Sequence, residues 1–143
     1  MSYTLNIVVK HAPAMPGSKN WSFILMSTAS EGAEYRLHCE RKGGPITFVS
    51  PGKRQTTPIY DDGYLGMITA DDLNGLTMRI EGGRCVEFAS ILGGTELVKG
   101  ATVLDWLVKV LENLHARGFS VHKLTKDQLN TTANRKLRGS RSC

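Results

Sequence analysis

The sequence predicts an α+β fold, an antiparallel sheet with one long amphipathic helix packed on a face and a short helix beside it. Two patterns carry this prediction. Strand-like segments fill the first third of the chain, and residues 101–118 repeat apolar side chains at helical spacing. The length of 143 residues suits one hydrophobic core. We therefore predict a single domain over residues 1–122, followed by a basic C-terminal helix and tail over residues 123–143.

Four strands are predicted in the first fifty residues. Residues 3–11 are rich in β-branched side chains, residues 20–28 are apolar on both faces, and residues 45–50 add a short strand. Residues 33–41 alternate, which places Tyr35, Leu37 and Cys39 on one face and Arg36, His38 and Glu40 on the other. We expect residues 20–28 and 33–41 to form a hairpin whose first strand is covered on both sides.

The middle of the chain predicts a loop, a short helix and a further strand. Residues 51–63 are polar, with proline, glycine and an Asp-Asp-Gly turn. Thr69 and Asp72 are spaced like a capping box, which predicts a short helix within residues 69–80. Residues 82–91 read as a glycine turn followed by a strand.

The clearest element is the amphipathic helix over residues 101–118. Its apolar stripe repeats at helical spacing, and Gly118 supplies a C-terminal stop. Residues 125–137 predict a weaker terminal helix, because several of them are poor helix formers.

Charge is concentrated at the C-terminus. The formal net charge is +5, and residues 123–143 hold six basic side chains against one acidic, so residues 1–122 are neutral with 12 of each sign. The tail has no aromatic residues to interleave with its charges. We expect a solvated tail and no nucleic-acid partner.

Several classes of protein are disfavoured by the composition. No apolar run is long enough to cross a bilayer, and Met1 to Thr4 do not begin a secretory signal, so we expect no membrane partner. Three widely spaced cysteines do not suggest a disulfide framework, which favours a cytoplasmic location. No metal-ligand spacing and no nucleotide-binding glycine motif is present, so we expect no metal and no cofactor. A homo-oligomer is left open.

Two cysteines are candidate nucleophiles. His38 and Cys39 are neighbours on a predicted strand and face opposite ways, so they cannot form a dyad with each other. Cys85 follows Arg84, but a strand cysteine is more often buried and inert.

Six aromatic residues could line an apolar cavity, although a role in the core is favoured for most of them. They are Trp21, Tyr35, Tyr60, Tyr64, Phe88 and Trp106.

Three segments resemble a group of small fungal proteins of uncharacterised function, the DUF7770 type. The segments are "KNWSFIL", "EYRLHCE" and "TVLDWLVKVLENLHARGF". That group looks similar to circularly permuted papain-like proteins of the NlpC/P60 and lecithin:retinol acyltransferase kind, in which a helix cysteine and a strand histidine form a dyad. The resemblance keeps the tryptophans, as Trp21 and Trp106. It puts Asn20 at the histidine position and Val103 at the cysteine position, so it implies that the dyad is lost.

A scaffold without its nucleophile could still catalyse cofactor-free chemistry. Our hypothesis is a cyclase or isomerase of fungal secondary metabolism, of the Diels–Alder type, that folds a small apolar substrate inside a pocket. The candidate catalytic residues are Asn20, Arg36, His38 and Tyr60, and the candidate substrate-binding residues are Trp21, Tyr35, Glu40, Val103 and Trp106. The alternative is a non-catalytic module that binds a ligand or a protein. Residual thiol catalysis by Cys85, or by Cys39 with His38, ranks last.

Overall fold

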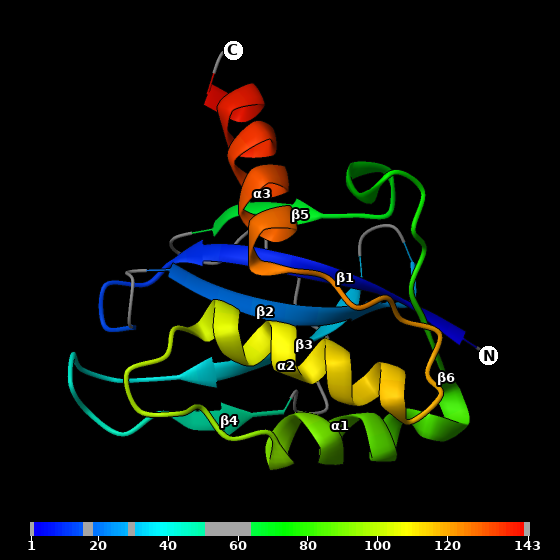
Figure 1. Ribbon diagram of the computed structural model, residues 1–143, viewed down its shortest axis with the longest axis horizontal. Coiled ribbons are helices and arrows are strands. Elements are labelled where there is room, and N and C mark those ends of the chain that lie inside the picture. The colour runs from blue at the N-terminus through cyan, green and yellow to red at the C-terminus, as the bar shows by residue number, and fades with distance from the viewer. Residues whose placement is uncertain (1, 16–18, 29–30, 51–63, 142–143) are drawn as a thin grey trace.

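A curved antiparallel sheet forms the centre of the molecule (Figure 1). The computed structural model describes residues 2–15, 19–28, 31–50 and 64–141. The main path of the sheet has the order β4-β3-β2-β1-β5, and β6 also pairs with β1. The strands are β1 Ser2–His11, β2 Lys19–Met26, β3 Gly32–His38, β4 Thr47–Val49, β5 Tyr64–Ile68 and β6 Arg79–Glu81. The predicted loop over residues 51–63 lies outside the described residues.

The long strand β1 organises the pairing. One edge pairs with β2 from Thr4↔Met26 to His11↔Lys19. The other edge pairs with β6 along its first residues and with β5 along its second half, so two short strands lie end to end beside one long one. The register against β5 shifts between Val9 and Lys10, and such a bulge bends the strand locally.

Helices α1 (Cys85–Gly94) and α2 (Val103–Ala116) cover one face of the sheet, while α3 (Lys126–Arg141) lies across β5 at the edge opposite β4 (Figure 1). Among the described residues, the single 3-10 turns η3 (Asp71–Leu73) and η4 (Gly82–Arg84) lie between β5 and α1. This arrangement confirms the predicted α+β class. Within the described residues, none of the helices is both long and apolar enough to span a membrane.

Helix α2 has well-defined ends. At its start, the Thr102 hydroxyl accepts from the Asp105 N–H and the Asp105 carboxylate accepts from the Thr102 N–H, which is a complete capping box. At its end, Gly118 adopts a positive φ of 81°, and the N–H groups of Gly118 and Phe119 donate to the carbonyls of His115 and Leu114. The predicted helix and its glycine stop are confirmed.

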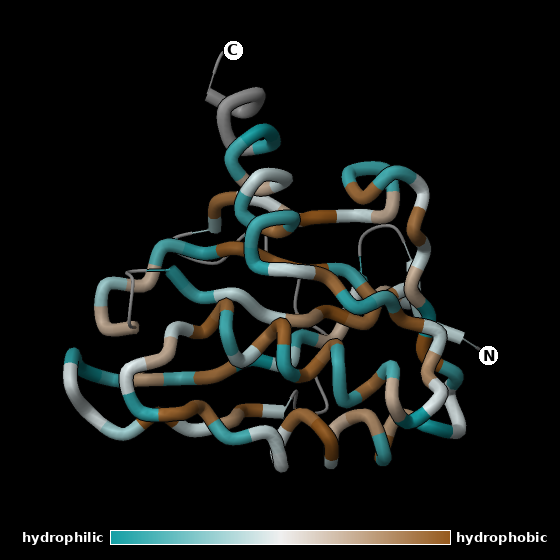
Figure 2. The backbone as a smooth tube through the Cα atoms, in the orientation of Figure 1, coloured by the Kyte–Doolittle hydropathy of each residue, from teal (hydrophilic) through white to brown (hydrophobic). Residues whose placement is uncertain are grey.

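The core lies between the sheet and the first two helices. Aromatic rings meet edge to face there: Tyr35 and Phe88 have centroids 5.0 Å apart, and Phe23 and Trp106 have centroids 5.9 Å apart. The Trp106 indole N–H donates to the carbonyl of Thr95 over 2.9 Å. Hydrophobic segments recur along α2, whereas α3 is largely polar (Figure 2).

Strand β2 is buried on both faces, as predicted. Phe23 faces the helices and is fully buried, and Ile24 on the other face is fully buried too. The pairing of β2 with β3 confirms the predicted hairpin, and β4 confirms the short strand predicted within residues 45–50.

The prediction of a strand within residues 82–91 is wrong, because this segment forms α1. The alternation of Val86 and Phe88 is typical of a strand, yet Val86 is 85% exposed and contributes little to the core. The buried positions are Phe88 and Leu92, four residues apart, which is a helical spacing. The core contact therefore follows the helical spacing and not the alternation.

The short helix predicted within residues 69–80 is reduced to one 3-10 turn. The hydrogen bonds expected at its start are present, since Asp72 accepts from the Thr69 N–H at 2.8 Å and from its hydroxyl at 3.0 Å. The chain then leaves the helical path, because Asn74 and Gly75 both have positive φ. The remaining residues turn back into β6.

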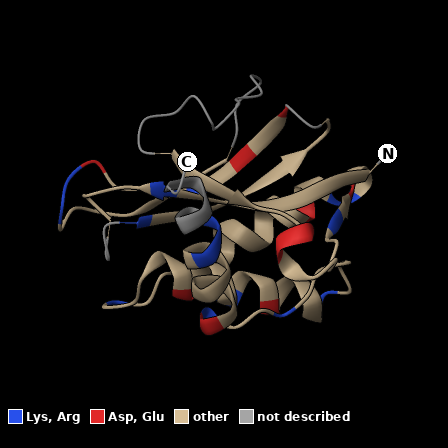
Figure 3. Cartoon of the chain, turned by 90° about the horizontal axis from the view of Figure 1, so that it is seen from above, with Lys and Arg blue, Asp and Glu red and all other residues tan. Residues whose placement is uncertain are grey.

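Helix α3 confirms the weak helix predicted near the C-terminus, and it packs against the body. Leu129 is fully buried, and Ala133 is nearly so. Ion pairs between described residues help to hold this helix, as Lys126 pairs with Asp105 at 2.7 Å and Lys136 with Asp72 at 2.6 Å. Basic residues are prominent on the ribbon of this helix (Figure 3).

Candidate functional site

The sheet separates the predicted site residues into two groups. Trp21, Tyr35, Val103 and Trp106 are buried in the core on the helix side. Asn20, Arg36 and His38 line a different hollow, at the end of the sheet where β1 leads into the following loop. Neighbouring strand residues point to opposite faces, so the tryptophan that follows Asn20 cannot share its side of the sheet.

Two predicted residues join neither group. Glu40 lies beyond the end of β3 and is exposed. Tyr60 lies outside the described residues.

Val103 is fully buried at the first turn of α2, and it is not among the described residues that line the hollow around Asn20. The two positions that would correspond to a papain-like dyad are therefore not brought together.

The hollow around Asn20 has a volume of about 400 Å³, within the usual size range of small-ligand sites. We call it the Asn20 pocket. Its described lining comes from the end of β1, the loop after it, and the strands β2 and β3. It consists of Lys10, His11, Ala12, Pro13, Ala14, Met15, Asn20, Arg36, His38 and Cys39. Like the other hollows of the molecule, it is open to solvent on one side.

Four further hollows have comparable volumes, and each has at least one carboxylate in its described lining. One of about 490 Å³ lies between α2 and the segment that joins it to α1, beside Trp106. Another of about 510 Å³ lies between the same segment and Phe48. The Asn20 pocket differs from both because it combines cations, imidazoles and a buried side-chain amide. We therefore take it as the candidate site.

The Asn20 side chain has a fixed orientation. Asn20 is paired with Lys10 across β1 and β2, and only 7% of it is exposed. Its Nδ2 donates to the carbonyl oxygen of Leu37 on β3 over 2.9 Å. Because a carbonyl can only accept, this bond places the amide nitrogen toward β3. The amide oxygen, Oδ1, is buried and has no hydrogen-bond partner among the described residues.

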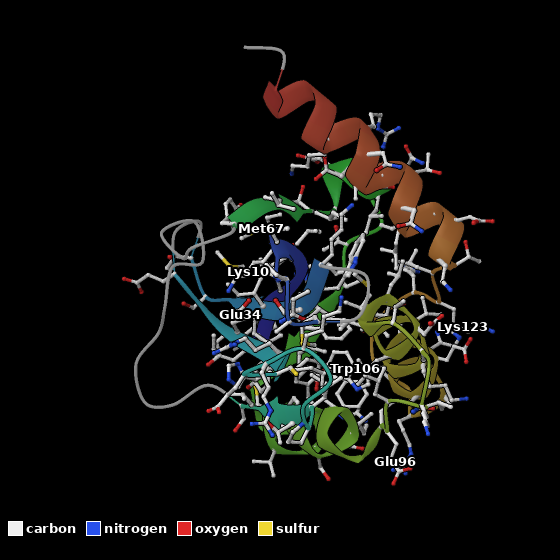
Figure 4. All side chains as sticks on the ribbon, turned by 90° about the vertical axis from the view of Figure 1, so that its left-hand side faces the viewer. Lys10, Glu34, Met67, Glu96, Trp106 and Lys123 are labelled. Carbon is white, nitrogen blue, oxygen red and sulfur yellow. The ribbon has the colours of Figure 1, made fainter. Side chains whose placement is uncertain are left out.

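A buried ionic network adjoins the pocket on the same face of the sheet. Lys10 on β1 reaches across β2 to Glu34 on β3, with an Nζ–Oε1 distance of 2.8 Å. The second carboxylate oxygen of Glu34 accepts from the Ser22 hydroxyl at 2.5 Å. Figure 4 shows Lys10 and Glu34 close together on one side of the sheet, with Trp106 on the other side. The network orders three strands with charges that are largely shielded from water.

Arg36 and His38 are neighbours on the same face of β3. The Nη1 of Arg36 lies 3.4 Å from Nδ1 of His38. A guanidinium can only donate, so Nδ1 must be the acceptor in this contact, and the proton of a neutral imidazole then resides on Nε2. The Arg36 side chain is 37% exposed, and its Nε lies 3.9 Å from Glu34. The contact leaves Nε2 of His38 as a donor.

The described lining is rich in donors and contains no carboxylate. Two cations, Lys10 and Arg36, and two imidazoles, His11 and His38, border the hollow. The nearest described carboxylate, Glu34, is already bound to Lys10 and Ser22. Such a lining suits an anionic oxygen group.

Sequence reasoning identified Asn20, Arg36 and His38 but missed Lys10, Ser22 and Glu34. A signal for Lys10 was present, because β1 alternates apolar residues with Asn6 and Lys10 on one face. The partnership of Lys10 with Glu34 spans two strand pairings, so it depends on the register of both. That register cannot be derived from either segment alone.

The cysteines are not arranged as nucleophiles. Cys85 is the first residue of α1, so it lies at a helix N-terminus and not on the predicted strand. Burial nevertheless raises the pKa of the Cys85 thiol, which disfavours a reactive thiolate. Cys39 is buried, and its Sγ lies 2.9 Å from the carbonyl oxygen of Arg41.

Within the described part of the chain, no three His, Cys, Asp or Glu side chains are placed to share a metal ion.

No protein-family model, no curated protein and no solved structure matches this chain. The resemblance to circularly permuted papain-like proteins therefore stays a prediction. The function must be inferred from the geometry of the Asn20 pocket itself.

Proposed function

We propose that this protein is a binding module for a small molecule that carries an anionic oxygen group, and that the Asn20 pocket is its site. One observation carries the proposal: cationic and imidazole side chains converge on a hollow of ligand size whose described lining has no carboxylate.

The ligand has both a charged end and an apolar part. Arg36 and the imidazoles supply donors for a carboxylate or a phosphate, and charge-assisted hydrogen bonds of this kind are the strong ones. The loop side of the pocket presents Ala12, Ala14 and the buried Met15, which suit an aliphatic or aromatic body. A volume of about 400 Å³ limits the ligand to a small molecule and leaves no room for a folded partner.

Calorimetric titration with a panel of small carboxylates and phosphate monoesters tests this proposal. We expect a bound member of the panel to lose affinity about tenfold in Arg36→Gln, because a charge-assisted hydrogen bond is removed. Lys123→Gln is the matched control. It removes one positive charge from an exposed position on the opposite side of the molecule from Lys10 (Figure 4). Equal losses in both variants would mean that only net charge matters, and the proposal would be wrong.

A cofactor-free cyclase or isomerase is a second candidate at the same pocket. Three of its four candidate catalytic residues, Asn20, Arg36 and His38, line this one hollow. In that case the donors would polarise a substrate carbonyl, and the pocket would hold the reacting conformer. The test is incubation of the protein with reactive dienes and product analysis. Conversion that survives in Asn20→Leu and Arg36→Gln at the parent rate would contradict this candidate.

A further inference from the structure

Arg36 and His38 lie on one face of β3, and both side chains line the Asn20 pocket. We infer that His38 is a positioning residue for the Arg36 guanidinium, and that an anion binds the pocket together with a proton, which His38 takes up. This inference rests on the proposed function of the Asn20 pocket. It adds dependence on pH to the recognition of an anionic group.

In the structure, the Arg36 guanidinium is directed toward groups of its own strand. Its Nη1 lies 3.4 Å from Nδ1 of His38, and its Nε lies 3.9 Å from a carboxylate oxygen of Glu34. A guanidinium stays protonated and only donates, so Nδ1 must offer a lone pair and the imidazole is neutral. The neutral imidazole therefore holds the guanidinium along β3.

Protonation of His38 reverses this contact. An imidazolium carries a hydrogen on each ring nitrogen, so Nδ1–H would face a donor of Arg36 across 3.4 Å, and two positive charges would repel each other. Both side chains have room to move, because Arg36 is 37% exposed and His38 is half-buried at the last residue of β3. The protonated state therefore releases the guanidinium.

An anionic group relieves this repulsion, because its oxygens accept from both side chains and its charge lies beside two cations. Arg36 and His38 are in contact and line the same hollow of about 400 Å³, so one bound group can reach both. Linkage then requires that the anion favours the protonated imidazole by the same factor as protonation favours the anion. Anion binding and proton uptake are thus coupled through His38.

The described surroundings of His38 contain one other group that ordinarily changes charge between about pH 5 and 8, the imidazole of His11. On the neighbouring strands, β2 contributes the amide of Asn20 and β4 places Thr47 opposite His38, and neither side chain ionises. The charged or titratable side chains around His38 are Lys10 and His11 from β1, Glu34 and Arg36 from β3, and Cys39 and Glu40 directly after β3.

The full chain in its parent form tests this inference by NMR titration with N-acetylglycinate. The carboxylate of this probe stays ionised between about pH 8 and about pH 5.5. We expect the probe to bind about tenfold more tightly at the lower pH. Imidazole ¹⁵N shifts follow each histidine separately, and at saturation the midpoint of His38 protonation moves up by about one pH unit, as a tenfold linkage requires. The midpoints of His115 and His122, which lie outside the described lining of the pocket, stay unchanged.

The Arg36→Gln variant separates positioning from simple charge. It removes the cation that faces His38, so a bound anion has less repulsion to relieve, and the shift of the His38 midpoint falls to below about half a pH unit. Lys123→Gln is the matched control, since it removes one positive charge from an exposed position away from the pocket and the shift stays at about one unit. A full shift in Arg36→Gln would mean that His38 acts by its own charge, and the positioning role would be wrong.

The remaining outcomes separate the inference from the proposed function. If the probe binds the pocket equally at both pH values and the His38 midpoint does not move, the inference is wrong, although the proposed function stands. Equal shifts in all 4 histidines would indicate a general effect of charge and would also overturn it. If the probe moves no amide of the pocket at either pH, the proposed function fails and the inference fails with it. The comparison of two pH values needs no substitution, so it holds even where a variant does not fold.

Discussion

Asn20 and Leu37 are joined by a 2.9 Å hydrogen bond from a side-chain amide on β2 to a backbone carbonyl on β3. This bond joins β2 to β3, the two strands that carry Asn20, Arg36 and His38, and it leaves the buried amide oxygen without a hydrogen-bond partner among the described residues. The same contact therefore orders the sheet and fixes Oδ1 as a buried acceptor.

The free energy of unfolding of Asn20→Leu tests whether the Oδ1 acceptor of Asn20 is unsatisfied in the folded protein. The substitution deletes one hydrogen bond, which costs about 1 kcal/mol, and it also removes an unsatisfied buried acceptor, which gains about as much. We expect the free energy of unfolding, measured with urea, to stay within about 1 kcal/mol of the parent. A loss well above about 2 kcal/mol would show that Oδ1 is satisfied in the unliganded protein.

The network of Lys10, Glu34 and Ser22 lies on the face of the sheet opposite α1 and α2, and we expect it to stabilise the fold. The Lys10 and Glu34 side chains are 11% and 6% exposed. Glu34→Gln removes the carboxylate charge that pairs with the largely buried ammonium of Lys10, and breaking a buried pair costs about 3–5 kcal/mol. The control is Glu112→Gln, whose exposed pair with Lys109 at 3.7 Å is expected to contribute less than about 1 kcal/mol. Equal losses in urea unfolding would contradict a structural role for the network.

Gly32 permits a close approach between β2 and β3. A Cβ added there would lie 2.7 Å from Sδ of Met26 and 2.8 Å from Cγ1 of Ile24, and Ile24 is fully buried. We expect Gly32→Ala to lower the free energy of unfolding by about 1–3 kcal/mol. Gly83→Ala is the matched control, because an added Cβ there meets nothing within 4 Å. Thermal unfolding that ranks the two variants the other way would contradict this packing.

The attachment of α3 depends on pH through Asp105 and Asp72. Hydrogen bonds from Lys126 and from the Thr102 backbone lower the pKa of Asp105. For Asp72, burial acts in the opposite direction, but bonds from Lys136 and Thr69 outweigh it and the pKa is lowered as well. A lowered pKa in the folded state means that the unfolded state binds protons more readily as the pH falls.

The stabilisation from these two carboxylates is therefore fully present above their ordinary pKa of 3.8 and is lost as the pH falls through the lower folded values. We expect amide hydrogen exchange in α3 to accelerate over this acidic range before exchange in β1 and β2 does. In Asp72→Asn, α3 should exchange faster at neutral pH and change less on acidification. Exchange in α3 that follows the sheet at every pH would contradict this account.

Much of the fold could be predicted because local pattern and tertiary packing agree in most segments. The alternation along β3 that places Tyr35 in the core also places Arg36 and His38 on the other face. Helix α2 ends just before Gly118 because glycine readily adopts the positive φ that a helix end requires. The strand predicted within residues 82–91 is wrong, because Phe88 and Leu92 are buried at helical spacing while Val86 is exposed. At that point burial, which the sequence does not reveal directly, decided between two periodicities.

The site was predictable only in part, for a similar reason. Arg36 and His38 follow from alternation along one strand, whereas the pocket needs Lys10 from β1 and the amide of Asn20 from β2 as well. Which residues of three strands lie side by side is determined by register. The grouping of Asn20 with Val103 came from a resemblance, and the structure places these two residues in different surroundings.

A ¹⁵N–¹H NMR titration with N-acetylglycinate, with the shifted backbone amides assigned to their residues, tests whether the Asn20 pocket binds an anionic ligand. We expect the largest shifts in residues 10–15 and 36–39, around the Asn20 pocket. The basic segment over residues 123–143 is the competing anion site, since it holds six basic side chains against one acidic. Shifts confined to that segment, with the amides of the pocket unmoved at saturation, would contradict the account.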